Sequence, residues 1–152
     1  MKYLHILLSI TLLLFSSCKE FGISDTIPGH GVKILKTPEG YRLYRNGEEY
    51  RMKGASGITN LELLHRTGGN SITAYEQFIS NQFLDSANQY DLTVAIILDV
   101  TKPMHGANYT DHAFIEKQRE RIYLFVNEYK DHPAVLFWII GNELHLGQRF
   151  NW

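Results

Sequence analysis

The chain has 152 residues, a length that predicts a single domain. Its formal net charge at pH 7 is −1 and 44% of its residues are hydrophobic, which is the composition of an ordinary globular protein and gives no electrostatic footprint for nucleic acid. The seven histidines are scattered, and no pair of them has the spacing of metal ligands. Composition therefore gives no reason to expect nucleic acid or a metal ion as a partner.

Residues 1–17 have the pattern of a secretory signal peptide, because Lys2 precedes an apolar stretch that is too short to span a bilayer as a helix. Cys18 follows directly and is the only cysteine, so no disulfide forms within the chain. The pattern is similar to the lipobox of bacterial lipoproteins. This implies that Cys18 is lipidated, that residues 18–31 form a tether, and that the protein is exported and membrane-anchored at the bacterial cell envelope, in the periplasm or at the outer surface. A plain signal peptide with an incidental cysteine is the alternative.

Residues 32–49 predict a short β-hairpin lead-in. Val32–Lys36 and Tyr41–Arg45 alternate apolar and polar side chains, as strands with one buried face do. Asn46-Gly47 then favours a tight turn, because both central positions of a type I′ turn need a positive φ. We therefore expect a small antiparallel meander ahead of the main domain.

From residue 50 onward, strand patterns alternate with helix patterns. This alternation predicts right-handed crossovers and a parallel sheet, so the predicted fold class is α/β. The expected strands are Tyr50–Gly54, Ser71–Tyr75, Leu92–Leu98 and Ala134–Ile140. The expected helices are a short one that Thr59 and Glu62 open as a capping box and Gly68-Gly69 end, one over about residues 77–89, and one from an Asp111 cap to about Lys130.

Apolar residues at helical spacing identify the face that each helix turns toward the sheet. We expect these residues to form the core together with the apolar strands. They are Leu61 and Leu64 in the first helix, Ile79, Phe83, Ala87 and Tyr90 in the second, and Ile115, Ile122, Val126 and Tyr129 in the third.

The fourth predicted strand ends abruptly in polar residues. Ala134–Ile140 is apolar throughout, which indicates a strand buried on both faces. Gly141, Asn142 and Glu143 follow at once, although an amide and a carboxylate have no packing reason to stand there. Barrel enzymes keep their catalytic groups at the C-terminal ends of strands. Asn142 and Glu143 are therefore the first candidates for a functional site.

Three segments resemble strands of the (β/α)8 catalytic domain of clan A glycoside hydrolases, of the kind found in family 2 and its exo-acting β-glycosidase relatives. HPAVLFWIIGNE is similar to the fourth strand, NGEEYRMKGASG to the opening strand, and GGNSITAY to the second. The resemblance covers residues 46–143. It implies a partial TIM barrel of about four βα units, preceded by the hairpin, in which residues 50–152 are the N-terminal half of the domain.

By that resemblance, Glu143 is the general acid/base of a retaining enzyme, which protonates the leaving-group oxygen and then deprotonates the attacking water. Asn142 is the residue that bonds the 2-hydroxyl of the sugar. His105, which precedes a glycine, lines the sugar site or is an ordinary loop histidine, and Tyr75 either faces the site or packs. Without the resemblance, Glu143 is better explained as a helix N-cap or a solvated loop carboxylate.

The chain departs from the family pattern at two points. Thr73 stands where the family has an arginine that orients the nucleophile, and a threonine supplies no charge. The nucleophile itself belongs to the seventh strand of the barrel, whereas about four strands are expected here.

The resemblance therefore implies a retaining glycoside hydrolase for β-linked carbohydrate, here as a truncated and inactive fragment, and it leaves the enzymatic status of these residues open. The alternatives are a non-enzymatic carbohydrate-binding surface lipoprotein and a truncated reading frame without a stable product. No cofactor is expected, because two carboxylates suffice for the chemistry. The expected partners are a β-glycoside and, through the lipid anchor, the membrane. Exposed sheet edges also predict self-association of the half-barrel.

Overall fold

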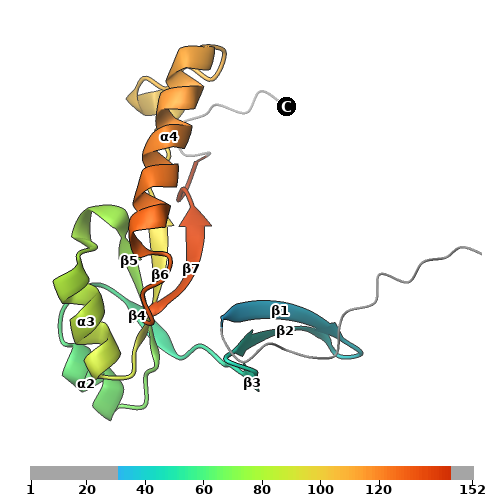
Figure 1. The fold of residues 1–152 in the computed structure, drawn as a ribbon, viewed down its shortest axis with the longest axis vertical. Helices are drawn as coiled ribbons and strands as arrows, with labels where there is room; N and C mark the ends of the chain where they lie inside the picture. The colour runs from blue at the N-terminus through green and yellow to red at the C-terminus, as the bar shows by residue number, and fades with distance from the viewer. Residues whose placement is uncertain (1–30, 145–152) are drawn as a thin grey trace, which may run out of the picture.

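The computed structural model describes residues 31–144. The predicted signal peptide (residues 1–17), the lipidation of Cys18 and nearly all of the predicted tether lie outside the described residues. The described part is α/β and consists of a three-stranded antiparallel sheet followed by a four-stranded parallel sheet with helices (Figure 1). The predicted fold class and the parallel sheet are confirmed.

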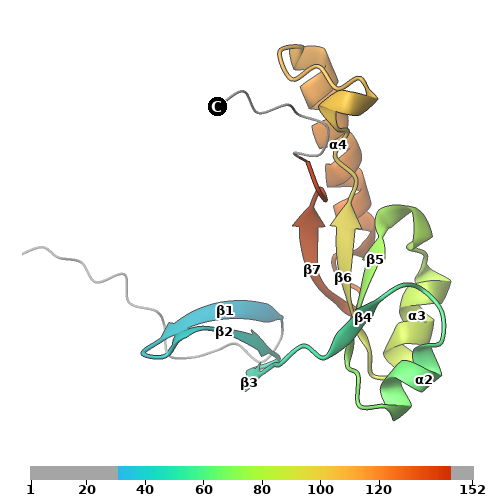
Figure 2. The same cartoon turned by 180° about the vertical axis from the view of Figure 1, so that it is seen from behind.

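The antiparallel sheet is a meander with two tight turns. β1 (Val32–Thr37) pairs with β2 (Gly40–Arg45), and β2 pairs with β3 (Glu48–Glu49). Asn46 and Gly47 have φ values of 51° and 88°, so both positions of the second turn have the positive φ that the sequence predicts. The meander lies to the side of the parallel sheet, level with the N-terminal ends of its strands (Figures 1 and 2).

The parallel sheet has the strand order β4-β5-β6-β7, so each strand lies beside the one that precedes it in the chain. The helices α2, α3 and α4 all lie on one face of this sheet, and the other face carries none of them (Figures 1 and 2). The strands are β4 (Gly54–Ser56), β5 (Ser71–Tyr75), β6 (Thr93–Leu98) and β7 (Val135–Ile140), and the helices are α2 (Leu61–Arg66), α3 (Asn81–Gln89) and α4 (His112–Tyr129).

The core lies between the parallel sheet and its helices. β6 is buried along its whole length, because β5 and β7 flank it and the helices cover it. Leu84 and Ala87 of α3 and Tyr129 of α4 pack in this core. Trp138 of β7 contacts Phe125 of α4 edge-to-face, with ring centroids 6.2 Å apart. Strands β5, β6 and β7 are thereby packed against the helices.

The first strand of the parallel sheet begins later than predicted: Tyr50–Gly54 is expected, whereas β4 is Gly54–Ser56. The reason is the side chain of Asn70, which forms hydrogen bonds with backbone groups of the residues just before β4. The backbone N–H of Lys53 donates to Asn70 Oδ1 at 2.7 Å, and Asn70 Nδ2 donates to the carbonyl of Arg51 at 2.9 Å. These bonds satisfy the backbone there without a neighbouring strand.

The capping box predicted at the start of α2 is wrong. The N-cap is Asn60 and not Thr59, and no side chain caps the helix. Asn60 has a φ of 57°, a left-handed conformation that asparagine tolerates much better than the β-branched threonine does. Leu61 and Leu64 pack against the core, as predicted.

The helix predicted over residues 77–89 is divided in two. A 3-10 turn, η1 (Glu76–Phe78), precedes α3. Ser80 separates the two because its side chain accepts a hydrogen bond from the backbone N–H of Phe83 at 3.2 Å, which makes it the N-cap of α3. The predicted apolar stripe is confirmed, although it omitted Leu84, which is fully buried.

α4 begins and ends close to its predicted bounds. The backbone N–H of Ala113 donates to Asp111 Oδ1 at 2.9 Å, which confirms the predicted N-cap. Three residues of the predicted stripe, Ile122, Val126 and Tyr129, pack against the core. The sequence therefore locates this helix and its inner face correctly.

Tyr129 predicts a loss of stability at alkaline pH. Burial raises the pKa of Tyr129 above its ordinary value of about 10, and the neighbouring carboxylate of Glu128 raises the pKa further. The folded protein therefore holds this proton more tightly than the unfolded chain does. The resulting contribution of Tyr129 to the free energy of unfolding is complete below about pH 10 and is lost as the pH rises through the folded-state pKa. Urea unfolding at about pH 8 and about pH 11 measures the loss. Tyr129→Phe should reduce the difference between the two values, and an unchanged difference would contradict the assignment.

Candidate functional site

Three predicted site residues lie at the C-terminal ends of β5 and β7. Tyr75 is the last residue of β5, and Asn142 and Glu143 follow β7. Asn142 Nδ2 donates to the Tyr75 hydroxyl at 3.1 Å. Since β6 separates β5 from β7, this bond passes over the end of β6, where the N–H of Gly141 donates to the carbonyl of Leu98 at 2.9 Å. The structure therefore brings Tyr75 and Asn142 together.

The backbone turns sharply as it leaves β7. Gly141 has a φ of 71° and Glu143 a φ of 51°. Glycine adopts such values freely, whereas a residue with a Cβ loses about 1–2 kcal/mol in the left-handed conformation. A Cβ on Gly141 would stand 2.7 Å from Leu144 Cδ2, but that exposed side chain can move aside, so the positive φ is what favours glycine at this position. Glu143 is thus held in a conformation that a glutamate rarely adopts.

Lys102 is the charged partner of Glu143. Its Nζ lies 4.0 Å from Glu143 Oε2, and the Lys102 side chain is 21% exposed while that of Glu143 is 56% exposed. The loop that carries Lys102 is fixed to α4, because Gln118 Oε1 accepts a hydrogen bond from the N–H of Thr101 at 2.8 Å. The hydroxyl of Tyr109 donates to the carbonyl of Thr101 at 2.7 Å. The ammonium group therefore extends to the glutamate from an anchored loop.

Arg121 of α4 joins the ends of β5 and β6. Its guanidinium donates to Glu76 Oε1 and to the carbonyl of Asp99. Glu76 follows Tyr75 directly and its side chain is 13% exposed, whereas the Arg121 side chain is 43% exposed, so the carboxylate is the buried partner of this ion pair. The other oxygen of Glu76 is buried with no hydrogen-bond partner. The helix thereby holds both strand ends in place beneath the candidate site.

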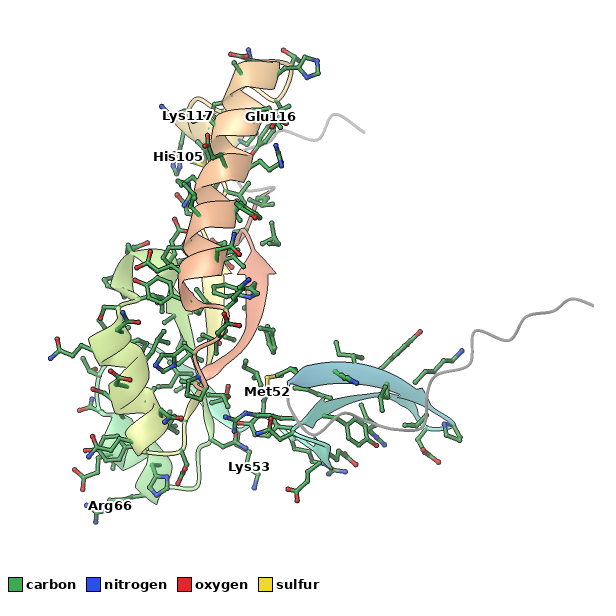
Figure 3. All side chains as sticks on the ribbon, in the orientation of Figure 1. Met52, Lys53, Arg66, His105, Glu116 and Lys117 are labelled. Carbon is green, nitrogen blue, oxygen red and sulfur yellow. The ribbon has the colours of Figure 1, made fainter. Side chains whose placement is uncertain are left out.

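The two remaining residues of interest lie apart from this group. His105 is exposed and ends the 3-10 turn η2 (Pro103–His105), where its backbone N–H donates to the carbonyl of Lys102 at 2.9 Å. Figure 3 shows it at the level of Glu116 and Lys117, beyond the ends of the strands. Thr73 lies within β5 and is half-buried, and its carbonyl accepts hydrogen bonds from the residues that end β4. Among the described residues, Asn142 and Glu143 form their side-chain hydrogen bond and ion pair with Tyr75 and Lys102, and not with His105 or Thr73.

Sequence analysis did not single out Lys102, Arg121 or Glu76. Lys102 had a usable indicator, because it follows the third strand in the loop where barrel enzymes place functional groups. Arg121 and Glu76 had none, since they are 45 positions apart and meet only when α4 packs on the sheet.

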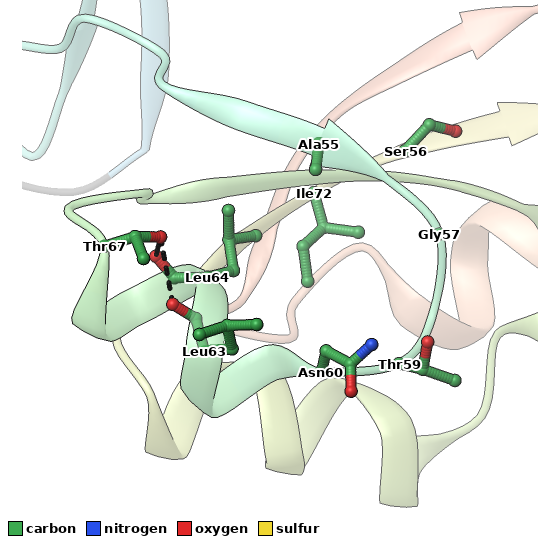
Figure 4. Close-up of a pocket in the computed structure, with 9 residues that line it drawn as sticks. All are labelled: Ala55, Ser56, Gly57, Thr59, Asn60, Leu63, Leu64, Thr67 and Ile72. Carbon is green, nitrogen blue, oxygen red and sulfur yellow. Dashed lines mark hydrogen bonds between the residues drawn. The ribbon is translucent and has the colours of Figure 1, made fainter.

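The hollow between β4, β5 and α2 contains none of the predicted site residues (Figure 4). Its volume is about 400 Å³, and its floor includes Ala55, Leu64 and Ile72. Asn60 and Thr59 contribute polar side chains to its rim. It lies at the β4 edge of the sheet, whereas Asn142 and Glu143 follow β7 at the other edge.

Residues 31–144 contain no group of three or more His, Cys, Asp and Glu side chains arranged to hold a metal ion. Within the same range, no helix has both the length and the hydropathy to cross a bilayer. Comparison with known proteins found no family profile and no curated protein that matches the chain.

Proposed function

We propose that this chain forms the N-terminal half of a retaining glycosidase domain of the (β/α)8 type, similar to clan A family 2 enzymes. The sequential strand order supports this proposal, because a sheet that curls into a barrel adds each new strand beside the last one. The placement of all three helices on one face supports it too, since barrel helices lie on the outside only. A doubly wound sheet would carry helices on both faces.

The observation that carries the proposal is the conformation of Glu143. A non-glycine residue is kept at a positive φ directly after Asn142, whose side chain is oriented by Tyr75. Such strain clusters at functional sites, where the surrounding structure maintains it. The backbone conformation of Glu143 and the orientation of the Asn142 amide therefore support the proposal.

The proposed roles follow from the available atoms. Because Asn142 Nδ2 donates to Tyr75, its Oδ1 is left to accept a hydrogen bond from a sugar hydroxyl. The carboxyl of Glu143 is exposed enough to reach a glycosidic oxygen, which it protonates as general acid. In retaining enzymes a second carboxylate stands about 5–5.5 Å from the first and forms the glycosyl-enzyme intermediate. The charged partner that the described residues place beside Glu143 is Lys102 and not a carboxylate.

A second candidate function is carbohydrate binding without hydrolysis, on the surface of a lipoprotein. The half-exposed ring of Tyr75 beside Asn142 favours it, because an aromatic face and an amide are what a sugar ring binds. We include in both candidates an exported protein that is anchored through a lipidated Cys18, because the pattern of residues 1–18 is the same in either case.

Titration of the full chain with methyl β-glycosides tests both candidates. Amide shifts of Tyr75, Asn142 and Glu143 in NMR spectra are expected to move with a shared saturation curve. Asn142→Ala should weaken binding about tenfold or more, because it removes the proposed acceptor and the bond to Tyr75. Asn81→Ala, at the start of α3, is the matched control and should leave binding unchanged. Shifts that appear elsewhere, or that survive Asn142→Ala, would contradict a sugar site at this position.

A further inference from the structure

The outer edge of β4 presents unpaired backbone groups. The carbonyl of Lys53 and the N–H of Gly57 both bond to the segment that contains β5. Because alternate residues of a strand point to opposite neighbours, Gly54 and Ser56 turn their N–H and C=O groups away from β5. No strand lies on that side of β4 within residues 31–144.

β7 presents the opposite edge of the same sheet. The N–H of Gly141 donates to Leu98 of β6, so Trp138 and Ile140 direct their N–H groups away from β6. The meander does not pair with this edge. A groove of about 570 Å³ separates them, and it is lined by Val32, Ile34 and Leu43 on one side and by the first four residues of β7 on the other.

The helix-free face between the two edges is apolar. Ala95 and Ile97 of β6 are 2% and 7% exposed, and they alternate with the residues that face the helices. Phe137 and Ile139 of β7 pair with them in register and are only partly buried. The apolar surface that this face leaves accessible is therefore on β7, whereas the side chains of β6 are already buried.

The ends of the two edges also carry opposite charges. Lys53 lies just before β4 and Asp131 lies a few residues before β7, and both are exposed, although Asp131 shares the hollow beside the meander with Arg45 and Lys130. If the two edges are joined as parallel strands, their N-terminal ends lie side by side. Lys53 of one copy then approaches Asp131 of another.

We propose that the parallel sheet pairs with a second copy of this chain around a two-fold axis parallel to the strands. β7 of each copy adds to β4 of the other, and the two helix-free faces form one closed core. A single rotation satisfies both edges, as an isologous interface requires. This chain carries both complementary edges, so a second copy supplies every strand that the closed arrangement needs; the C-terminal half of a glycosidase barrel would occupy the same two edges, and a wild-type chain that stays monomeric would favour that occupant.

Proline substitutions test the proposal, because proline removes a backbone donor and is tolerated at a strand edge. Ile140→Pro removes an N–H that points away from β6, and Ser56→Pro does the same at β4. Gly54→Pro is unsuitable, since a Cβ there would stand 2.5 Å from the carbonyl oxygen of Ser71. The matched control is Ile140→Val, which keeps the donor and a branched side chain.

Sedimentation velocity of the full chain in mild detergent gives the readout. The wild type and Ile140→Val are expected to be dimers at micromolar concentration, and each proline variant is expected to dissociate about tenfold more readily. An equimolar mixture of the two proline variants should associate more tightly than either alone, because the mixed dimer has one edge pair with no proline.

Circular dichroism checks that each variant folds. If a proline variant loses its spectrum, Ile139→Lys takes its place, since it keeps every backbone donor and charges the helix-free face; it is expected to give monomers. A monomeric wild type, or proline variants that dimerise like the wild type, would overturn the proposal. A mixture that gains nothing over its components would overturn the pairing of β7 with β4.

Discussion

Leu84→Ala is expected to lower the free energy of unfolding by about 2–5 kcal/mol, which is a large fraction of the stability of a small domain. Leu84 has no exposed surface and packs from α3 into the core beneath the parallel sheet. Truncation removes three buried carbons and leaves a cavity that the surrounding strands cannot fill. Urea unfolding followed by circular dichroism measures the change in midpoint and slope.

Leu124→Ala is the matched control for this experiment. Leu124 lies on α4 and is 61% exposed, so the same substitution removes little buried surface there. We expect a change within about 0.5 kcal/mol, as for most surface positions. If the two substitutions have the same effect, α3 does not pack on the sheet as described, and the core assignment is wrong.

Glu143→Gln is expected to have the largest effect on activity in a completed barrel. The chain would be joined after Trp152 to the C-terminal half of a family 2 glycoside hydrolase, which supplies the nucleophile strand. Glutamine cannot donate the proton, so hydrolysis of alkyl β-glycosides should fall by about 10²–10⁴-fold. Aryl glycosides with good leaving groups need less protonation. For them, the substitution should slow formation of the glycosyl-enzyme less than it does for alkyl glycosides.

Two further variants make this test specific. Glu120→Gln on α4 makes the same chemical change outside the site and should leave the rate unchanged. Thr73→Arg should increase the rate, because it restores the charge that orients the nucleophile in the family. The 152 residues tested alone are expected to show no hydrolysis. Activity of the chimaera that survives Glu143→Gln would refute the acid/base role of this glutamate.

The parts of the fold that the sequence predicts well depend on local rules. The positive φ values at Asn46 and Gly47 and the N-cap at Asp111 involve groups within three residues of each other. The apolar run that forms β6 is recognisable because a strand buried on both faces has no polar alternation. Each of these features is decided before the chain makes any distant contact.

The parts that the sequence does not predict depend on distant contacts. Asn70 is 17 residues from Lys53, and its side chain delays the start of β4. The failure of the capping box is local by contrast, because Asn60 adopts a left-handed conformation that leaves the preceding threonine outside the helix. No periodic pattern reports either event, because neither involves an apolar residue.

The candidate site shows the same division. Asn142 and Glu143 are recognisable because they interrupt an apolar run, and the position of Tyr75 follows from the end of its strand. The bond between Asn142 and Tyr75 joins residues 67 positions apart, and only the side-by-side order of the strands brings them together. The ion pair of Lys102 with Glu143 likewise depends on how the loop after β6 is held by α4.

The sequential order of β4, β5, β6 and β7 has a consequence for the kinetics of folding. Within this sheet, one α-helix separates each strand from the next strand along the chain, which is also its neighbour in the sheet. Loop closure therefore costs comparatively little entropy for a parallel sheet. Each βα unit docks on the unit synthesised before it, without waiting for a strand from the other end of the chain. A polypeptide that emerges N-terminus first from a ribosome or a translocation pore therefore assembles this sheet in the order of its synthesis.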